Sequence, residues 1–195
     1  FVLKLKSLTN IWIKSLRRGP TGVGHTLQEL LGIDEDNIAL PDLHSAELKA
    51  HRVGTKNMIT LFTFNRKAWK MKPLNAIRKY GTPDKNGRLG LYFTMSLKPN
   101  SQGLFLDTDS ESISVRHKSG EIIAAWNLGN LKEQFIKKIP AMILVGAATE
   151  ERAGVEWFQY TRARLLTGTS PDTLLSQIEE GNVLVDLRLH DKGTS

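Results

Sequence analysis

The sequence predicts a mixed fold of the α/β or α+β class, and three observations point to it. Segments whose apolar residues lie three or four apart, typical of helices, alternate along the chain with segments whose apolar residues alternate with polar ones, typical of strands. The length of 195 residues and the 40% hydrophobic content suffice for one domain, or two packed lobes, with an ordinary core. No internal repeat and no low-complexity segment is present.

Residues 2–16 carry apolar side chains at helical spacing, so we expect one amphipathic helix or two short ones. Arg17, Arg18, Gly19 and Pro20 then break the pattern, and a short helix is expected from Thr26 to the glycine at position 32. The acidic stretch 34–37 is expected to be a loop, and 46–52 and 57–64 are expected to be strands.

The remaining chain predicts short strands and helices that alternate. Proline opens the predicted helices 73–80 and 171–180, where its fixed φ suits the first turn. A third helix is expected over 128–139. The expected strands are 90–97, 104–108, 112–117, 121–126, 141–148, 155–166 and the segment that ends at His190. We expect a single domain over 1–195, with one lobe over about 1–80 and a second over about 81–195.

The composition excludes several classes of site and of protein. Without cysteine there is no disulfide, thiolate metal site or cysteine nucleophile, and a cytoplasmic location is the simplest expectation. No run approaches the ~20 apolar residues of a spanning helix, and we expect neither a signal peptide nor a membrane partner. Residues 1–100 carry 17 Lys and Arg against 7 Asp and Glu, whereas 101–195 carry 10 against 13. A phosphate-rich partner or solvated lysines would both explain this asymmetry.

Residues 19–26, GPTGVGHT, come within one residue of the nucleotide-binding loop G-x-x-x-x-G-K-[ST]. The missing residue is the lysine that contacts the β- and γ-phosphates, for which a neutral His25 is no substitute. The strand that should run directly into the first glycine is also missing, since Arg17 and Arg18 stand there. A Gly-rich turn that lets Gly22 and Gly24 approach a nucleic-acid phosphate is the better hypothesis, and a plain tight turn is the alternative.

Asp42, Glu47 and Lys49 form the pattern P-D-x4-E-x-K. Two carboxylates at the ends of neighbouring strand segments can bind one divalent cation, with a backbone carbonyl between them, that of Leu48, as a further oxygen ligand. Glu47 and Lys49 lie two apart on a predicted strand and therefore project from the same face. The ammonium could then orient an attacking water and stabilise charge on phosphorus. E-x-K by itself is a weak signal, and a solvated strand face is its alternative.

The run from Arg17 to Asn37, PDLHSAELKAHR at 41–52 and NMITLFT at 57–63 together resemble the MvaI/BcnI family of restriction endonucleases. This family is related to the mismatch-repair nickase MutH within the PD-(D/E)xK nucleases. The likeness is strongest over about 13–70, and VDLRLHDKGTS near the end also resembles the family. The resemblance implies a restriction-endonuclease-like mixed sheet flanked by helices, and a bacterial monomer that clamps double-stranded DNA between a catalytic and a recognition lobe.

The resemblance also implies roles for individual residues. Asp42 and Glu47 match the acidic metal ligands and Lys49 the catalytic lysine, while Glu29 matches an acidic helix residue near the metal. Gln28 is the alternative to Glu29, which is preferred because it carries charge. The implied reaction is Mg²⁺-dependent hydrolysis of a DNA phosphodiester, with Mn²⁺ as a substitute, that leaves a 5′-phosphate and a 3′-hydroxyl. A methyltransferase acting on the same site is a possible partner.

Several basic residues are expected to contact DNA, in addition to the two glycines of the turn. They are Arg17, Arg18, His51, Arg52, Arg66, Lys67, Lys70, Arg116 and Arg162. The alternatives are a polar strand end for His51 and Arg52 and a solvated charge run around Trp69. Trp126 and Trp157 are expected in the core.

Two rival functions remain at this stage: a DNA-binding module that has lost catalysis, and a MutH-like nickase. Nucleotide binding by residues 19–26 is a third, weaker hypothesis.

Overall fold

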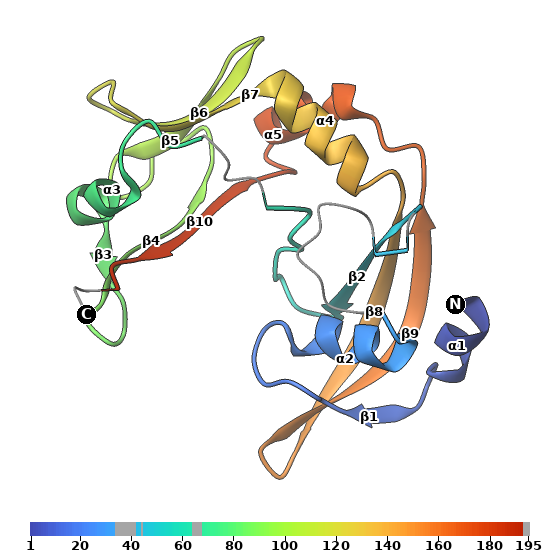
Figure 1. Ribbon diagram of the computed structural model, residues 1–195. Helices are drawn as coiled ribbons and strands as arrows, with labels where there is room; N and C mark the ends of the chain where they lie inside the picture. The colour runs from blue at the N-terminus through green and yellow to red at the C-terminus, as the bar shows by residue number, and fades with distance from the viewer. Residues whose placement is uncertain (34–41, 44, 64–67, 193–195) are drawn as a thin grey trace. The chain divides into compact units, whose positions relative to one another are not determined.

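The computed structural model describes residues 1–33, 42–43, 45–63 and 68–192. Helices and strands alternate along this part of the chain, and the strands form several sheets, which confirms the expected mixed α/β class (Figure 1). Two compact units are distinguished by their internal contacts. Unit 1 comprises residues 1–63 and 135–169, and unit 2 comprises residues 64–134 and 170–195. No helix among the described residues is long and apolar enough to span a bilayer.

Unit 1 is built on a four-stranded mixed sheet in the order β1-β9-β8-β2. The strands are β1 (Trp12–Lys14), β2 (Glu47–Arg52), β8 (Met142–Arg152) and β9 (Val155–Leu166). β8 and β9 form a long antiparallel hairpin, and β2 pairs with β8 in parallel, so β2 lies at one edge of the sheet. The expected β-strands over 46–52, 141–148 and 155–166 are confirmed, and the hairpin strands extend further.

The helix α2 (Gly22–Leu31) packs against one face of this sheet (Figure 1). Val23 and Leu27 of the helix meet Leu48, Val145 and other buried residues of β2, β8 and β9. Leu27 is fully buried, and Gly32 ends the helix in the left-handed conformation that glycine adopts without strain. One sheet face is therefore closed by α2, and residues at alternate positions project from the other face.

Unit 2 contains two three-stranded antiparallel sheets, β10-β4-β3 and β5-β6-β7. The strands of the first are β3 (Thr82–Pro83), β4 (Leu89–Met95) and β10 (Val185–His190). Those of the second are β5 (Leu104–Thr108), β6 (Ser112–His117) and β7 (Ile122–Asn127). The helix α3 (Pro73–Tyr80) contacts β4 and β10, and the 3-10 turn η1 (Pro171–Thr173) leads into α5 (Leu174–Glu179). These elements confirm the expectations for this part of the chain.

Two expectations for the N-terminal part are wrong. The helical spacing of residues 2–16 gives only α1 (Val2–Ser7), because Asn10 adopts a positive φ and Trp12–Lys14 instead pairs with β9. The expected strand over 57–64 is not formed over Asn57–Thr63, where apolar side chains such as Met58 are exposed and no strand partner is described. In the first place pairing with β9 decides against the local pattern, and in the second the apolar pattern alone does not suffice for a strand. The expected loop at 34–37 and Phe64 lie outside the described residues.

The boundary between units also differs from the expected division near residue 80. The hairpin of β8 and β9 supplies the strands next to β1 and β2, so residues 135–169 join unit 1 although they are far away in sequence. The helix α4 (Leu128–Lys138), expected over 128–139, crosses this boundary: its last residues, from Phe135, belong to unit 1. These last residues bring a side chain to the site described next.

Candidate active site

Glu47 is the centre of a charged cluster at the start of β2. Its carboxylate is almost completely buried, with 2% of the side chain exposed. The Lys49 Nζ lies 2.7 Å from Oε1, as expected for residues on the same strand face. The Lys138 Nζ, at the end of α4, lies 3.0 Å from Oε2. Both oxygens of a buried carboxylate are therefore paired with ammonium groups, which compensates for the loss of hydration.

Asp42 lies beside this pair. Its backbone amide is 3.4 Å from Glu47 Oε2, and its Oδ2 accepts a 3.0 Å hydrogen bond from the Leu48 amide. Burial, and then the negative charge of Glu47, raise the pKa of Asp42 above its usual value. The structure thus brings together the three residues that the sequence pattern singles out, from a turn and one strand. Their closeness confirms the geometric part of the prediction and leaves their roles to experiment.

The backbone of Leu48 faces the open edge of the sheet. Glu47 donates its amide to Ala141 and Val53 donates to Ala147, so the odd-numbered residues of β2 direct their backbone groups towards β8. The amide and carbonyl of Leu48 point the opposite way, because the two groups of one strand residue project in the same direction. Its amide meets Asp42 on that side. The Leu48 carbonyl is thus available on the side of Asp42.

This donor set fits a hard divalent cation. Burial first, and then repulsion by Glu47, raise the pKa of Asp42, and a bound cation would offset both effects. A backbone carbonyl on the same side adds a third oxygen. No group of three or more His, Cys, Asp or Glu that could hold a metal is found within the described ranges. Mg²⁺ commonly keeps several water ligands beside one or two carboxylates.

The face of the sheet opposite α2 carries further basic residues. Residues paired across strands share a face, so the register aligns Lys49 with Leu144 and Arg164, and His51 with Gly146 and Arg162. Both arginines are exposed, and a Cβ at Gly146 would lie 2.9 Å from the Arg162 Nε, so the arginine crosses the glycine. Arg162 and Arg164 thus lie on the face that carries Glu47 and Lys49, which favours contacts with phosphates for both.

The two candidate residues of α2, Glu29 and Gln28, lie in different surroundings. A shallow pocket of about 230 Å³ is lined by Gln28 and His25 of α2 together with Leu48 and Lys49. Glu29 is exposed on the next position of the helix and does not line this pocket. The difference follows from the helix itself, because consecutive residues point about 100° apart. The pocket does not include Asp42 or Glu47, so the expected role of Glu29, with Gln28 as its alternative, stays a prediction.

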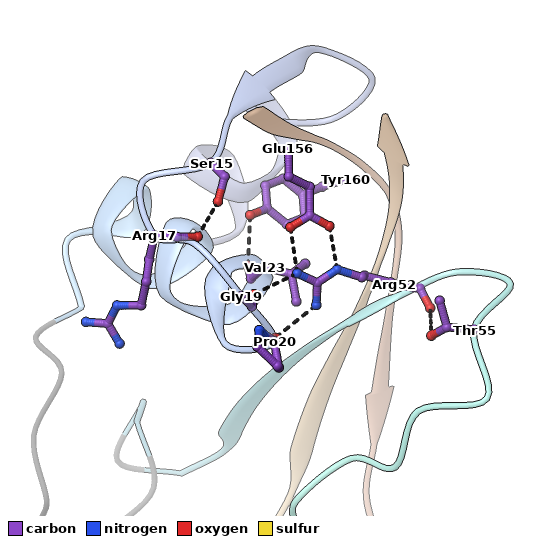
Figure 2. Close-up of polar contacts among 9 residues, drawn as sticks. All are labelled: Ser15, Arg17, Gly19, Pro20, Val23, Arg52, Thr55, Glu156 and Tyr160. Carbon is purple, nitrogen blue, oxygen red and sulfur yellow. Dashed lines mark hydrogen bonds and ion pairs between the residues drawn. The ribbon is translucent and has the colours of Figure 1, made fainter. Parts of the chain in front are cut away.

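Arg52 is held inside unit 1 by its own contacts (Figure 2). Its guanidinium forms two bonds with Glu156, Nε to Oε1 at 2.6 Å and Nη2 to Oε2 at 2.7 Å. It also donates to the carbonyls of Pro20 at 2.9 Å and Gly19 at 3.0 Å, and lies over the Phe158 ring at 5.4 Å. These contacts fix the turn before α2 onto the sheet. These contacts use four of the five N–H groups of the guanidinium, which points to a structural role, and the expected DNA contact by Arg52 stays a prediction.

Comparison with known proteins identifies the family. The model of the MvaI/BcnI restriction endonuclease family matches residues 2–195. The chain belongs to this family. The structure of restriction endonuclease MvaI with its cognate DNA substrate superposes with a TM-score of 0.82 at 26% identity, over 100% of this chain and 85% of that chain. MvaI without DNA gives a TM-score of 0.51 over the same shares, also at 26% identity. No curated protein matches the chain.

The Gly-rich turn leads directly into the helix α2, which begins within it. The helix begins at Gly22, four residues earlier than expected, so His25 lies in its first turns. A Cβ at Gly22 would lie 2.4 Å from the Arg17 carbonyl oxygen, whereas Gly24 has open space around it. Packing explains the glycine at position 22. Gly24 remains a candidate for close approach to DNA.

The other expected DNA contacts remain predictions. Arg17 is half-buried and Arg18 exposed, and Figure 2 shows the Arg17 side chain directed away from the Arg52 cluster. Lys70 is exposed, while Arg116 forms an ion pair with Asp107 at 2.7 Å. The expected contacts by Arg66 and Lys67 fall outside the described residues.

Sequence reasoning also misplaced two tryptophans and missed one lysine. Trp126 and Trp157 are half-buried and not in the core, and the Trp157 ring packs against Arg152 at 4.7 Å. Lys138 was missed because it lies 91 positions from Glu47, and its own helix gives no sign in the sequence that it contacts the strand of Glu47. The pair Lys137-Lys138 before Ile139 and Pro140, at a predicted helix end, was the one local signal.

Proposed function

We propose that this member of the restriction endonuclease family hydrolyses phosphodiesters of double-stranded DNA at a specific sequence, with Mg²⁺ as cofactor and Mn²⁺ as a substitute. The observation that carries the proposal is the convergence of Asp42, Glu47 and Lys49 at the open edge of β2. Family membership and the likeness to MvaI bound to its cognate DNA support the substrate class. The oxygen donors support the choice of a hard divalent cation.

The side chains would divide the work as follows. Asp42, Glu47 and the Leu48 carbonyl would hold the cation, which when bound acidifies a water and stabilises negative charge on phosphorus. The Lys49 ammonium, fixed by Glu47 at 2.7 Å, would orient the attacking water and donate hydrogen bonds to the phosphate. Water attack would leave a 5′-phosphate and a 3′-hydroxyl. Glu29 of α2, or its neighbour Gln28, would support the site.

The open face supplies a path for the DNA backbone. Arg162 and Arg164 project beside His51 and Lys49 from the face that carries Glu47. Each positive charge that neutralises a phosphate releases counterions, so such a row favours binding without reading sequence. Within this proposal Arg162 binds phosphate and does not read bases.

The proposal extends to the working state of the protein. We propose a monomer that encloses DNA with both units and acts in the cytoplasm, where a methyltransferase with the same specificity would protect the host DNA. The resemblance to the family supports these points.

Plasmid cleavage tests the proposal. Purified protein is incubated with supercoiled DNA in Mg²⁺ or in EDTA, beside the Lys49→Ala variant. We expect discrete linear fragments in Mg²⁺, no cleavage in EDTA, and loss of cleavage in the variant. Sequencing of the fragment ends gives the recognition site. Nicked circles alone would favour the nickase, and salt-sensitive binding without any cleavage would favour an inactive DNA-binding module.

A further inference from the structure

Lys138 occupies a position on Glu47 that the catalytic pattern does not explain. Lys49 already supplies the lysine of the pattern and contacts Oε1. Lys138 comes from a different element, the last turn of α4, and contacts the other oxygen, Oε2, at 3.0 Å. To bind a divalent cation, Glu47 must offer it at least one carboxylate oxygen. In the described contacts each of the two oxygens is already paired with an ammonium group. The two oxygens thus have a cation each before any metal binds.

Among the described residues, the charges at the site balance in this state. Asp42 and Glu47 carry two negative charges when ionised, and Lys49 and Lys138 carry two positive ones. A divalent ion added to this set would leave an excess of two positive charges in a largely buried place. Like charges a few ångströms apart repel strongly where little water screens them. One ammonium therefore has to leave as the cation binds.

Lys138 is the ammonium that can leave. Lys49 is held beside Glu47 by their shared strand face, whereas Lys138 lies in the last turn of a helix on a flexible four-carbon stem. Its side chain is 16% exposed, so solvent reaches it, and its loss does not disturb a strand of the sheet.

We propose that Lys138 is an internal competitor of the metal: its ammonium takes the place of the cation on Glu47 Oε2 and must move away before the metal binds. It acts as a positioning residue, since it sets the state of Glu47. This inference rests on the proposed function, because it concerns the same carboxylate. It predicts weak metal binding by the wild-type protein in the absence of DNA, and tighter binding once the Lys138 charge is removed.

Mn²⁺ binding without DNA tests this directly. Free Mn²⁺ is measured by electron paramagnetic resonance for the wild type, Lys138→Met and Lys138→Arg. The matched control is Lys137→Met, which removes the same charge from the neighbouring, exposed residue of α4. We expect at least tenfold tighter binding for Lys138→Met, wild-type binding for Lys138→Arg, and a change below about twofold for the control, since a charge in water is well screened.

Further variants assign the effect to Glu47. The double variant Lys138→Met/Glu47→Gln should lose the added affinity. Thermal unfolding checks that each variant is folded, and Lys138→Gln replaces Lys138→Met if the latter is not. Mn²⁺ binding by the folded variant that equals or falls below that of the control would overturn the inference.

A second readout separates this inference from the proposed function. The Mg²⁺ concentration that gives half-maximal plasmid cleavage should fall at least threefold in Lys138→Met and stay unchanged in Lys137→Met. If the wild type cleaves but neither midpoint nor Mn²⁺ affinity moves, the inference fails and the proposed function stands. If the wild type cleaves with no metal, the proposed function fails, and Mn²⁺ binding still decides the role of Lys138.

Discussion

The contacts of Arg52 predict a structural role that can be measured as a loss of stability. Arg52→Met keeps an unbranched apolar stem and removes two bonds to Glu156 and two to the carbonyls of Gly19 and Pro20. The side chain is 14% exposed and that of Glu156 31%. Loss of one partner costs about 3–5 kcal/mol for a buried pair and at most about 1 for an exposed one. Partial exposure of Glu156 places the expected cost at about 2–3 kcal/mol.

Thermal unfolding in EDTA is the assay. For a chain of this size each kcal/mol lowers Tm by roughly 2–4 °C, so Arg52→Met should unfold about 5–10 °C below the wild type. Arg52→Lys keeps the charge but lacks the planar fork, so it should recover less than half of this loss. The control is Arg188→Met, whose arginine is 53% exposed and pairs with Asp186 at 2.7 Å. We expect a change below about 1 kcal/mol there.

DNA binding adds a second criterion. A residue that contacts phosphate changes the salt dependence of binding by about 0.9 in the slope of log K against log salt. Arg52→Met, which removes the charge, should leave this slope unchanged, because Arg52 is bound within the protein. The reasoning is refuted if Arg52→Met is no less stable than Arg188→Met, or if the slope falls by one unit.

Three further predictions concern the helix, the carboxylates and the open face. Gly22→Ala should lower the free energy of unfolding by about 1–3 kcal/mol, because its Cβ would meet the Arg17 carbonyl oxygen. Gly24→Ala should raise it by about 0.5–1 kcal/mol, because that position has open space and alanine favours a helix. Urea unfolding measures both. Asp42→Asn should raise Tm in EDTA at pH 7–8. The pKa of Asp42 is raised in the folded protein, so its ionised carboxylate lowers stability at a pH above that pKa. The gain in Tm from the substitution should therefore shrink as the pH falls through the pKa of Asp42. Replacing Arg162 and Arg164 together by Gln should reduce the salt slope of DNA binding by about two units, measured by fluorescence anisotropy on a labelled duplex, and an unchanged slope would exclude both from the interface.

The sequence predicts the local part of the fold and of the site well. Glu47, Lys49 and Asp42 lie within eight positions, so strand parity and a short turn suffice to bring them together. Proline-started helices such as Pro73–Tyr80 are likewise determined locally, because the ring fixes φ at the first position.

What depends on distant pairing could not be predicted. Trp12–Lys14 becomes a strand only because β9 lies beside it, although its own spacing is helical. Arg52 resembles a surface arginine until Glu156, 104 positions away, is placed next to it. Lys138 reaches Glu47 only after β2 and β8 pair in parallel and α4 enters unit 1 at its last turn. In each case the partner lies far away in the sequence, so the local pattern does not predict the contact.

The central claim is that the carboxylate of Glu47 is essential for metal-dependent DNA cleavage. The most direct measurement is the single-turnover rate of plasmid cleavage at saturating Mg²⁺ for the wild type and for Glu47→Gln, which keeps the shape of the side chain and removes its charge. Glu151→Gln, an exposed glutamate of the same unit, is the control. The account predicts that Glu47→Gln loses at least a factor of about 1,000 in rate while DNA binding in EDTA is retained, since transition-state charge stabilisation is worth this much. Cleavage by Glu47→Gln within tenfold of the control would contradict it.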